Sequence, residues 1–109
     1  MNAVSEPRTK TGKQVKINYK LLKHSATFLR AINHPLRQKM LNLIEKEGNI
    51  NVTQIYIKLR LEQSVASQHL AILRDAGFVT AIRNGKFINY EINKERIQQA
   101  NELIQAINN

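Results

Sequence analysis

The run from Phe78 to Ile92, F-V-T-A-I-R-N-G-K-F-I-N-Y-E-I, constrains the fold of this chain more than any other stretch. It is rich in β-branched and aromatic residues, and it surrounds the dipeptide Asn84-Gly85. Asn-Gly favours a two-residue type I′ turn, because both central residues of that turn have positive φ. We therefore expect a β-hairpin whose two-residue loop pairs Arg83 with Lys86.

This pairing places Arg83 and Lys86 at the tip of the hairpin, beyond any core. One face of the hairpin then carries apolar side chains that can pack against helices, since alternate residues of a strand share a face. The residues expected on that face are Val79, Ala81, Ile88, Tyr90 and Ile92.

The segments before the hairpin have the periodicity of amphipathic helices. A first helix is expected from Ile17 to Ile32, with one broad apolar face. Asn33 is the expected N-cap of a second helix, and Pro35 is tolerated in its first turn because its missing N–H has no helical partner there. Gly48 is expected to end that helix in a left-handed cap.

Two shorter helices are expected next, separated by a tight turn. The first opens at residues 51–53, and the second runs from Gln63 or Ser64 to Asp75. Two short helices around a tight turn, followed directly by a hairpin, are typical of a winged helix-turn-helix. The predicted fold is therefore mainly α with a small β-hairpin (α+β), with about five helices and a two-stranded wing.

The C-terminal segment adds a last helix with an apolar stripe at i, i+3, i+4, i+7 spacing. A chain of 109 residues builds one modest core, which hardly uses an apolar stripe at each end. We therefore expect the end helices to form a homodimer. The residues expected at that interface are Leu21, Phe28, Ile97, Leu103, Ile104 and Ile107.

The charge of the chain points to a polyanionic partner. The formal net charge is +9 and the pI is about 10.2, with an excess of basic residues in both the N-terminal arm and the rest of the chain. Residues 1–15 are polar and aperiodic, so they are expected to be a flexible basic arm before a single domain at residues 16–109. Double-stranded DNA, RNA and an acidic surface all fit such a charge.

Several classes of function are disfavoured by what the chain lacks. There are no cysteines, so disulfides, thiolate metal sites and thiol redox sensing are excluded. No apolar run approaches the ~18 residues of a membrane span, and the N-terminus does not resemble a secretory signal. No nucleophile elbow or phosphate-binding glycine loop is present, so no enzyme activity and no cofactor are expected. A cytoplasmic location is expected.

The helix from residue 63 to residue 75 has the composition of a reading helix. Gln can hydrogen-bond an adenine edge in two places, Ser can reach a base or a phosphate, and Val can touch a thymine methyl. The alternative interpretation is an ordinary amphipathic helix capped by Ser64. The candidate DNA-binding residues are Ser64, Val65, Ser67, Gln68, His69, Arg83 and Lys86.

The order of these motifs resembles the ArsR family of bacterial transcriptional regulators over about residues 20–107. S-x-H-L at residues 67–70, followed by L-R-D-A-G-F-V at residues 73–79, is similar to that family's reading-helix signature. I-R-N-G-K-F-I-N-Y at residues 82–90 matches its wing pattern, except that Ile82 stands where the family often has Arg. H-P-L-R at residues 34–37 resembles its D-P-x-R helix start.

The resemblance implies a homodimeric repressor that an inducer releases from DNA. Metal-sensing members of the family carry E-L-C-V-C-D-L where this chain has N-I-N-V-T-Q-I, so Asn51 and Thr53 replace the two cysteines. Lys94, Arg96 and Ile107 stand where the family's second metal site has its ligands. Neither set suits a metal, and no metal site is expected. A small-molecule effector of unknown identity, a protein partner or no effector at all remain open.

The leading hypothesis is a sequence-specific, homodimeric transcriptional regulator, most simply a repressor. One alternative is a winged helix used as a protein-interaction module, because fold does not fix function. Another is a nucleic-acid binder that is indifferent to sequence and acts through charge alone. An interaction module should expose apolar residues on the candidate reading helix, whereas charge-driven binding should give equal affinity for any duplex.

Overall fold

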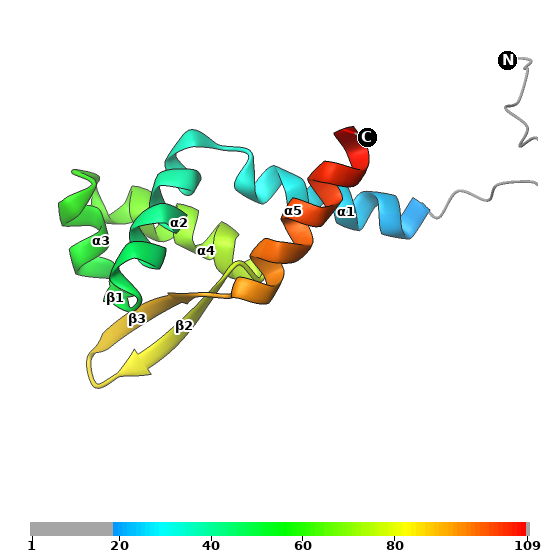
Figure 1. The fold of residues 1–109 in the computed structure, drawn as a ribbon. Helices are drawn as coiled ribbons and strands as arrows, with labels where there is room; N and C mark the ends of the chain where they lie inside the picture. The colour runs from blue at the N-terminus through cyan, green and yellow to red at the C-terminus, as the bar shows by residue number, and fades with distance from the viewer. Residues whose placement is uncertain (1–18, 109) are drawn as a thin grey trace, which may run out of the picture.

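The computed structural model describes the backbone of residues 19–108 and the side chains of residues 25–107. The expected basic arm at residues 1–15 and the side chain of Leu21 lie outside this range. The described chain forms five helices and a three-stranded antiparallel sheet of order β1-β3-β2 (Figure 1). Their bounds are α1 Tyr19–Ile32, α2 Pro35–Glu47, β1 Ile50–Asn51, α3 Val52–Lys58, α4 Gln63–Asp75, β2 Val79–Asn84, β3 Phe87–Ile92 and α5 Lys94–Asn108.

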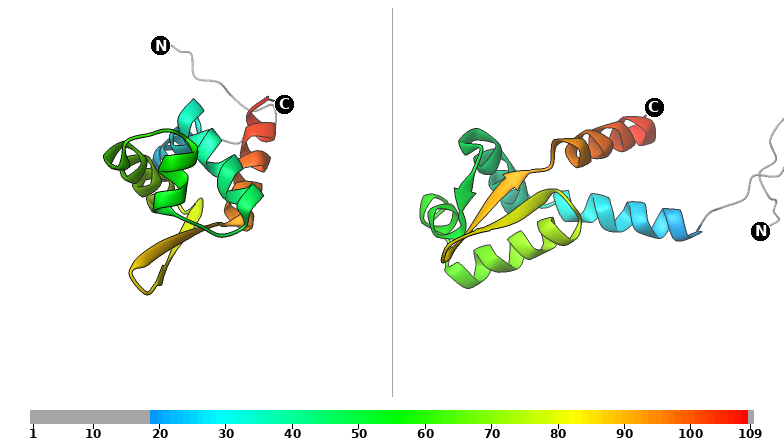
Figure 2. Two further views of the ribbon diagram at one scale, coloured as in Figure 1. Left: turned by 90° about the vertical axis from the view of Figure 1, so that its left-hand side faces the viewer. Right: turned by 90° about the horizontal axis from the view of Figure 1, so that it is seen from below.

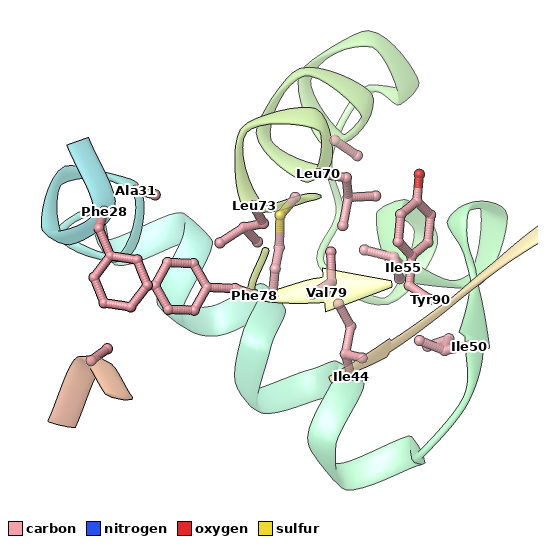
Figure 3. Packing of buried hydrophobic residues seen from close by; sticks show 13 residues of the cluster. Phe28, Ala31, Ile44, Ile50, Ile55, Leu70, Leu73, Phe78, Val79 and Tyr90 are labelled. Atoms are coloured by element: carbon pink, nitrogen blue, oxygen red, sulfur yellow. The ribbon is translucent and has the colours of Figure 1, made fainter. Parts of the chain in front are cut away.

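The core lies where α2, α3 and α4 meet the inner face of the sheet. Phe78, at the entry to β2, is fully buried and stacks on Phe28 of α1, with ring centroids 4.8 Å apart (Figure 3). Tyr90 of β3 is also buried and points toward the helices. The other buried apolar residues are Ala31, Met40, Ile44, Ile50, Ile55, Ala66, Leu70, Leu73, Val79 and Ala100.

The hairpin forms, but its register differs from the expectation. Asn84 pairs with Phe87 and Ala81 with Tyr90, so the two loop residues are Gly85 and Lys86 rather than Asn84 and Gly85. Gly85 has φ 64°, and Arg60 is the sole described non-glycine residue with positive φ. A turn with positive φ only at its first central residue is a type II′ turn, which favours Gly at that position. Asn84 therefore stays in β2 and does not adopt positive φ.

The shift leaves the expected inner face intact. Each β2 residue gains a partner two positions further along β3, and a shift of two preserves the alternation of faces. Val79 and Tyr90 are buried, whereas Ile88 remains largely exposed because it lies beyond the helices. The strand β1 was not expected, since two residues are too few to show alternation. Ile50 of β1 pairs with Tyr90 and is itself buried.

The end of α1 and the start of α2 differ from the expectation in their cap. His34, not Asn33, is the N-cap: its Nδ1 accepts a hydrogen bond from the N–H of Leu36 at 3.1 Å, and Pro35 follows at N1. Gly48 ends α2 with positive φ as expected, although its ψ of −50° lies outside the left-handed helical region. That combination favours glycine all the same.

The helices and the wing divide between two ends of the molecule. The wing tip and the pair α3–α4 lie at one end, whereas the later part of α5 and the early part of α1 project from the other (Figures 1 and 2). Over the described part of the chain, no helix is long and apolar enough to cross a membrane.

Candidate nucleic-acid interface

The first turns of α4 present polar side chains to solvent. Ser64, Ser67 and Gln68 are exposed, and Val65 is half-buried. On the opposite side of the same turns, Ala66 and Leu70 are fully buried and hold the helix on the core. The sequence prediction of a helix with one anchored and one polar face is therefore matched by the geometry.

The turn between α3 and α4 depends on a residue in an unusual conformation. Arg60 has φ 56°, a region that glycine usually occupies at a helix C-terminus. The N–H of the next residue, Leu61, donates to the carbonyl of Tyr56 at 2.8 Å, which is the long hydrogen bond of a Schellman motif. This closure sets the angle between the two helices and leaves the Arg60 side chain exposed.

His69 is less exposed than Ser64, Ser67 and Gln68. It is half-buried, and its Nδ1 lies 3.1 Å from a terminal nitrogen of Arg37. An arginine can only donate, so the Nδ1 atom of His69 accepts, and only its Nε2 is left for other contacts. The ring also lies against His34, with centroids 4.8 Å apart. Burial, followed by the proximity of His34 and Arg37, lowers the pKa of His69.

Arg37 was not singled out as functional by the sequence, yet it connects three elements. It is buried on α2, and its Nε donates to the carbonyl of Ala31 while a terminal nitrogen donates to the carbonyl of Arg30 at 3.0 Å. Its other terminal nitrogen contacts His69 of α4. Cations at a helix C-terminus satisfy free carbonyls and suit the helix dipole. Arg37 thus positions α4 relative to α1.

Arg96 is a second connector that the sequence did not reveal. Its Nε donates to the carbonyl of Ala76, at the end of α4, at 3.0 Å. Its guanidinium also lies over the ring of Phe28, 4.6 Å from the centroid. The sequence shows that Arg96 is a cation within an amphipathic helix, but it does not show which groups Arg96 contacts. Arg96 therefore ties α5 to α4 and α1, and it is engaged in the fold rather than in a ligand set.

The wing carries exposed cations at its tip. Arg83 and Lys86 are both exposed, and the Nζ of Lys86 lies 5.6 Å from the centroid of the Phe87 ring. Within the described residues, the ion pairs join Lys58 to Glu47 at 3.9 Å and Arg74 to Asp75 at 3.4 Å, all away from the wing. The positive charge at the tip is therefore free to meet an external anion.

The residues expected at a dimer interface fall into two groups. Phe28 is buried in its own chain against Phe78 and Arg96, so it holds α1 on the core. Ile104 and Ile107 are exposed and line a groove with a volume of ≈ 300 Å³. The remaining lining residues are Leu29, Ile32, Asn33 and Gln38.

Ile97 and Leu103 are half-buried on the same helix. Ile97 lines a smaller hollow of ≈ 190 Å³ between α2 and α5, together with Ala100. Both hollows therefore lie along one face of α5, which continues from the edge of the core to the exposed C-terminal turns.

The position that resembles a metal-binding cysteine of the ArsR family has a structural role here. Asn51 is the N-cap of α3: its Oδ1 accepts from the N–H of Gln54 at 2.9 Å, and the Gln54 side chain accepts from the N–H of Asn51. This reciprocal pair is a capping box. Between residues 25 and 107, no three His, Cys, Asp or Glu side chains gather where they could hold a metal ion.

Comparison with known proteins decides the family. The model described as "Bacterial regulatory protein, arsR family" matches residues 34–81. The transcriptional repressor PagR of Bacillus anthracis is 37% identical over 92 residues, which cover 84% of this chain and 92% of PagR. The chain belongs to the arsR family of bacterial regulatory proteins. The resemblance inferred from the reading-helix, wing and H-P-L-R motifs is confirmed.

Solved structures of similar proteins share the fold. NolR from Sinorhizobium fredii superposes with a TM-score of 0.71 at 27% identity, covering 87% of this chain and 96% of NolR. The crystal structure of PagR gives a TM-score of 0.64 at 36% identity, over 80% of this chain and 99% of PagR. Mb0332 from Mycobacterium bovis, described as a homodimeric winged helix-turn-helix DNA-binding domain, gives 0.69 at 26% identity over 86% of each chain. The predicted winged helix-turn-helix is confirmed.

Proposed function

We propose that this arsR-family regulator is a homodimeric repressor that reads a pseudo-palindromic duplex in the cytoplasm. The observation that carries the proposal is the polar, exposed face of α4 at Ser64, Ser67 and Gln68, at the same end of the molecule as the cationic wing tip. An interaction module would expose apolar side chains on this face of α4. The repressor assignment also draws on PagR, which is named a transcriptional repressor.

The proposed contacts divide by chemistry. Gln68 and Val65 meet base edges in the major groove, while Ser64 and Ser67 reach bases or phosphates. Arg83 and Lys86 of the wing hold the flanking backbone. His69 keeps only its Nε2 for DNA, since its Nδ1 is engaged with Arg37. It therefore contributes mainly by fixing the helix.

The proposed dimer forms through the groove between α1 and α5. Ile104 and Ile107 are exposed there beside Leu29 and Ile32, and two such faces can cover one another in a symmetric contact. The DNA-reading elements lie at the opposite end of each subunit, so a dimer through α1 and α5 sets two reading helices apart (Figure 2). Paired reading helices bind half-sites about one helical turn, roughly 34 Å, apart. Mb0332 is described as homodimeric, which supports this assembly.

The test is selection of bound duplexes from a random pool, followed by affinity measurements at several salt concentrations. We expect an inverted repeat bound at least about a thousandfold more tightly than random DNA. Equal affinity for all duplexes, with a steep salt dependence, would instead establish charge-driven binding. Absence of DNA binding would refute the proposal and favour a protein partner.

A further inference from the structure

The wing tip exposes apolar side chains that the fold does not use. Phe87 is 45% exposed and Ile82 is 41% exposed. Because Asn84 pairs with Phe87 and Ile82 with Asn89, Phe87 and Ile82 lie on the same outward face as diagonal neighbours, away from the core. A hairpin tip in water favours polar residues. The exposed Phe87 ring and Ile82 side chain therefore indicate a surface that a binding partner covers.

The charge around this pair indicates what the occupant is. Lys86 lies over the Phe87 ring, with its Nζ 5.6 Å from the ring centroid, whereas Arg83 pairs with Ile88 and so lies on the opposite face of the hairpin. Glu91 is the single carboxylate of the wing. It lies four residues along β3 from Phe87, about 13 Å away, where it accepts a hydrogen bond from Asn49 at 2.7 Å. An apolar surface beside a lysine, on a hairpin whose single carboxylate lies at the far end, fits an anionic polymer with apolar patches, and it disfavours a second copy of the same positive tip.

The shape of the hairpin limits how it meets DNA. The two strands project from the body with the turn at their end (Figure 1). The minor groove of B-DNA is roughly 6 Å wide, too narrow for a two-stranded ribbon but accessible to a turn and its adjoining side chains. Phe87 is the first residue after the turn, so it is the large apolar side chain that enters such a groove first.

We infer that Phe87, supported by Ile82, is an apolar wedge that enters the minor groove beside the reading site and bends the DNA. This inference rests on the proposed DNA-binding function and adds to it a way of reading sequence. Apolar side chains at base steps partly unstack them and kink the duplex. Pyrimidine–purine steps such as TA yield to this deformation more easily than A-tracts do. The wing thus selects flexible flanks without hydrogen bonds to bases.

The experiment measures DNA bending and flank preference together. Two end-labelled duplexes of about 30 base pairs are used: one recovered from the random pool and one fixed, unselected sequence. Each is made with a TA step or an A-tract in the flank that the wing reaches, and end-to-end energy transfer gives the bend. We expect the natural protein to bend the TA duplexes by 20° or more, roughly the lower limit for such wedges.

Three variants test whether the bend depends on an apolar side chain at position 87. Phe87→Ala should abolish most of the bend and reduce the preference for TA over the A-tract at least about threefold. Phe87→Leu keeps an apolar wedge and should retain most of both. Ile88→Ala is the matched control, because Ile88 is 38% exposed on the opposite face of the same hairpin and its loss should change neither quantity. Circular dichroism and thermal unfolding verify that each variant folds.

The outcomes separate this inference from the function on which it rests. Specific binding with an unchanged bend in Phe87→Ala would overturn the wedge and leave the regulator intact. A Phe87-dependent bend on the unselected duplex, without any recovered motif, would support the wedge while refuting specific recognition. Absence of DNA binding overturns both. Phe87-dependent binding to phosphatidylserine vesicles with no DNA bend would assign the surface to lipid and refute the wedge.

Discussion

Arg37 offers the sharpest test of how the reading helix is held. Two residues separate the end of α1 at Ile32 from Pro35, which has no N–H. The carbonyl of Ala31 therefore cannot accept the usual helical bond from the residue four positions on, and the Nε of Arg37 donates to it instead. Replacing Arg37 by Met keeps the bulk of the side chain but removes every donor.

The magnitude follows from the three contacts. The Ala31 carbonyl is buried and loses its donor, which costs about 1–3 kcal/mol. The Arg30 carbonyl keeps a hydrogen bond from the N–H of Asn33 at 3.3 Å, and His69 is only half-buried, so each loss there costs less. Part of this loss in stability is offset, because the substitution removes the cost of burying a charged guanidinium. We expect Arg37→Met to lower the free energy of unfolding by about 2–3 kcal/mol.

The assay is urea unfolding at one fixed protein concentration, because a dimer's stability depends on concentration. Arg37→Lys is the matched control: it retains the charge and one donor but not the planar fork, so it should recover only part of the loss. A change below about 0.5 kcal/mol for Arg37→Met, within the range of an ordinary surface substitution, would refute the reasoning. Full stability of Arg37→Lys would show that charge alone suffices.

The other predictions concern the interface, the turn and the dimer. Gln68→Ala should relax base choice in the selected motif, whereas Lys86→Ala should weaken all duplexes about evenly and reduce the salt slope by roughly one; an unchanged specificity ratio in Gln68→Ala would remove α4 as the reading helix. The lowered pKa of His69 means that the folded state favours the neutral ring. The stability it contributes is therefore present above pH 6.5 and is lost as pH falls through the lowered pKa. Urea unfolding between pH 5 and pH 8 should show a smaller acid loss in His69→Gln, and identical profiles would contradict this. Arg60→Gly should raise the unfolding free energy by up to about 1 kcal/mol, because Arg60 has positive φ, and a loss would show that the side chain supports the turn. Ile107→Asp should shift the protein toward monomer in sedimentation velocity, since Ile107 is 62% exposed in the α1–α5 groove; an unchanged dimer would place the interface elsewhere.

Much of the fold was predictable because local signals agreed with the final packing. The short helix before the turn was predicted to open at residues 51–53, and the structure adds that Asn51 is its cap. The next helix, α4, was predicted with small polar residues in its first turns. The hairpin followed from Asn84-Gly85, although its register did not. The expected and the observed registers place the same residues on the inner face, so the hydrophobic pattern could not distinguish them. The difference lies in the turn type, with Gly85 and Lys86 in the loop instead of Asn84 and Gly85.

The parts of the site that the sequence missed depend on contacts between distant segments. Arg37 and Arg96 appear in the sequence as cations within helices, and such residues are usually solvated. Their roles arise from carbonyls at the ends of α1 and α4, whose positions only the folded chain defines. Phe28 was assigned to a dimer face because periodicity shows that a side is apolar without showing what covers it. The buried partner is Phe78, fifty residues away in the chain.

The capping box at the start of α3 has a consequence for the stability of variants at Asn51. Asn51 satisfies the backbone of α3 at the position that resembles a cysteine of the family's metal-sensing members. A cysteine at this position would remove a side-chain cap worth about 1 kcal/mol before any metal had bound. A variant with this single substitution is therefore less stable than the natural chain, and metal binding would first have to offset that loss.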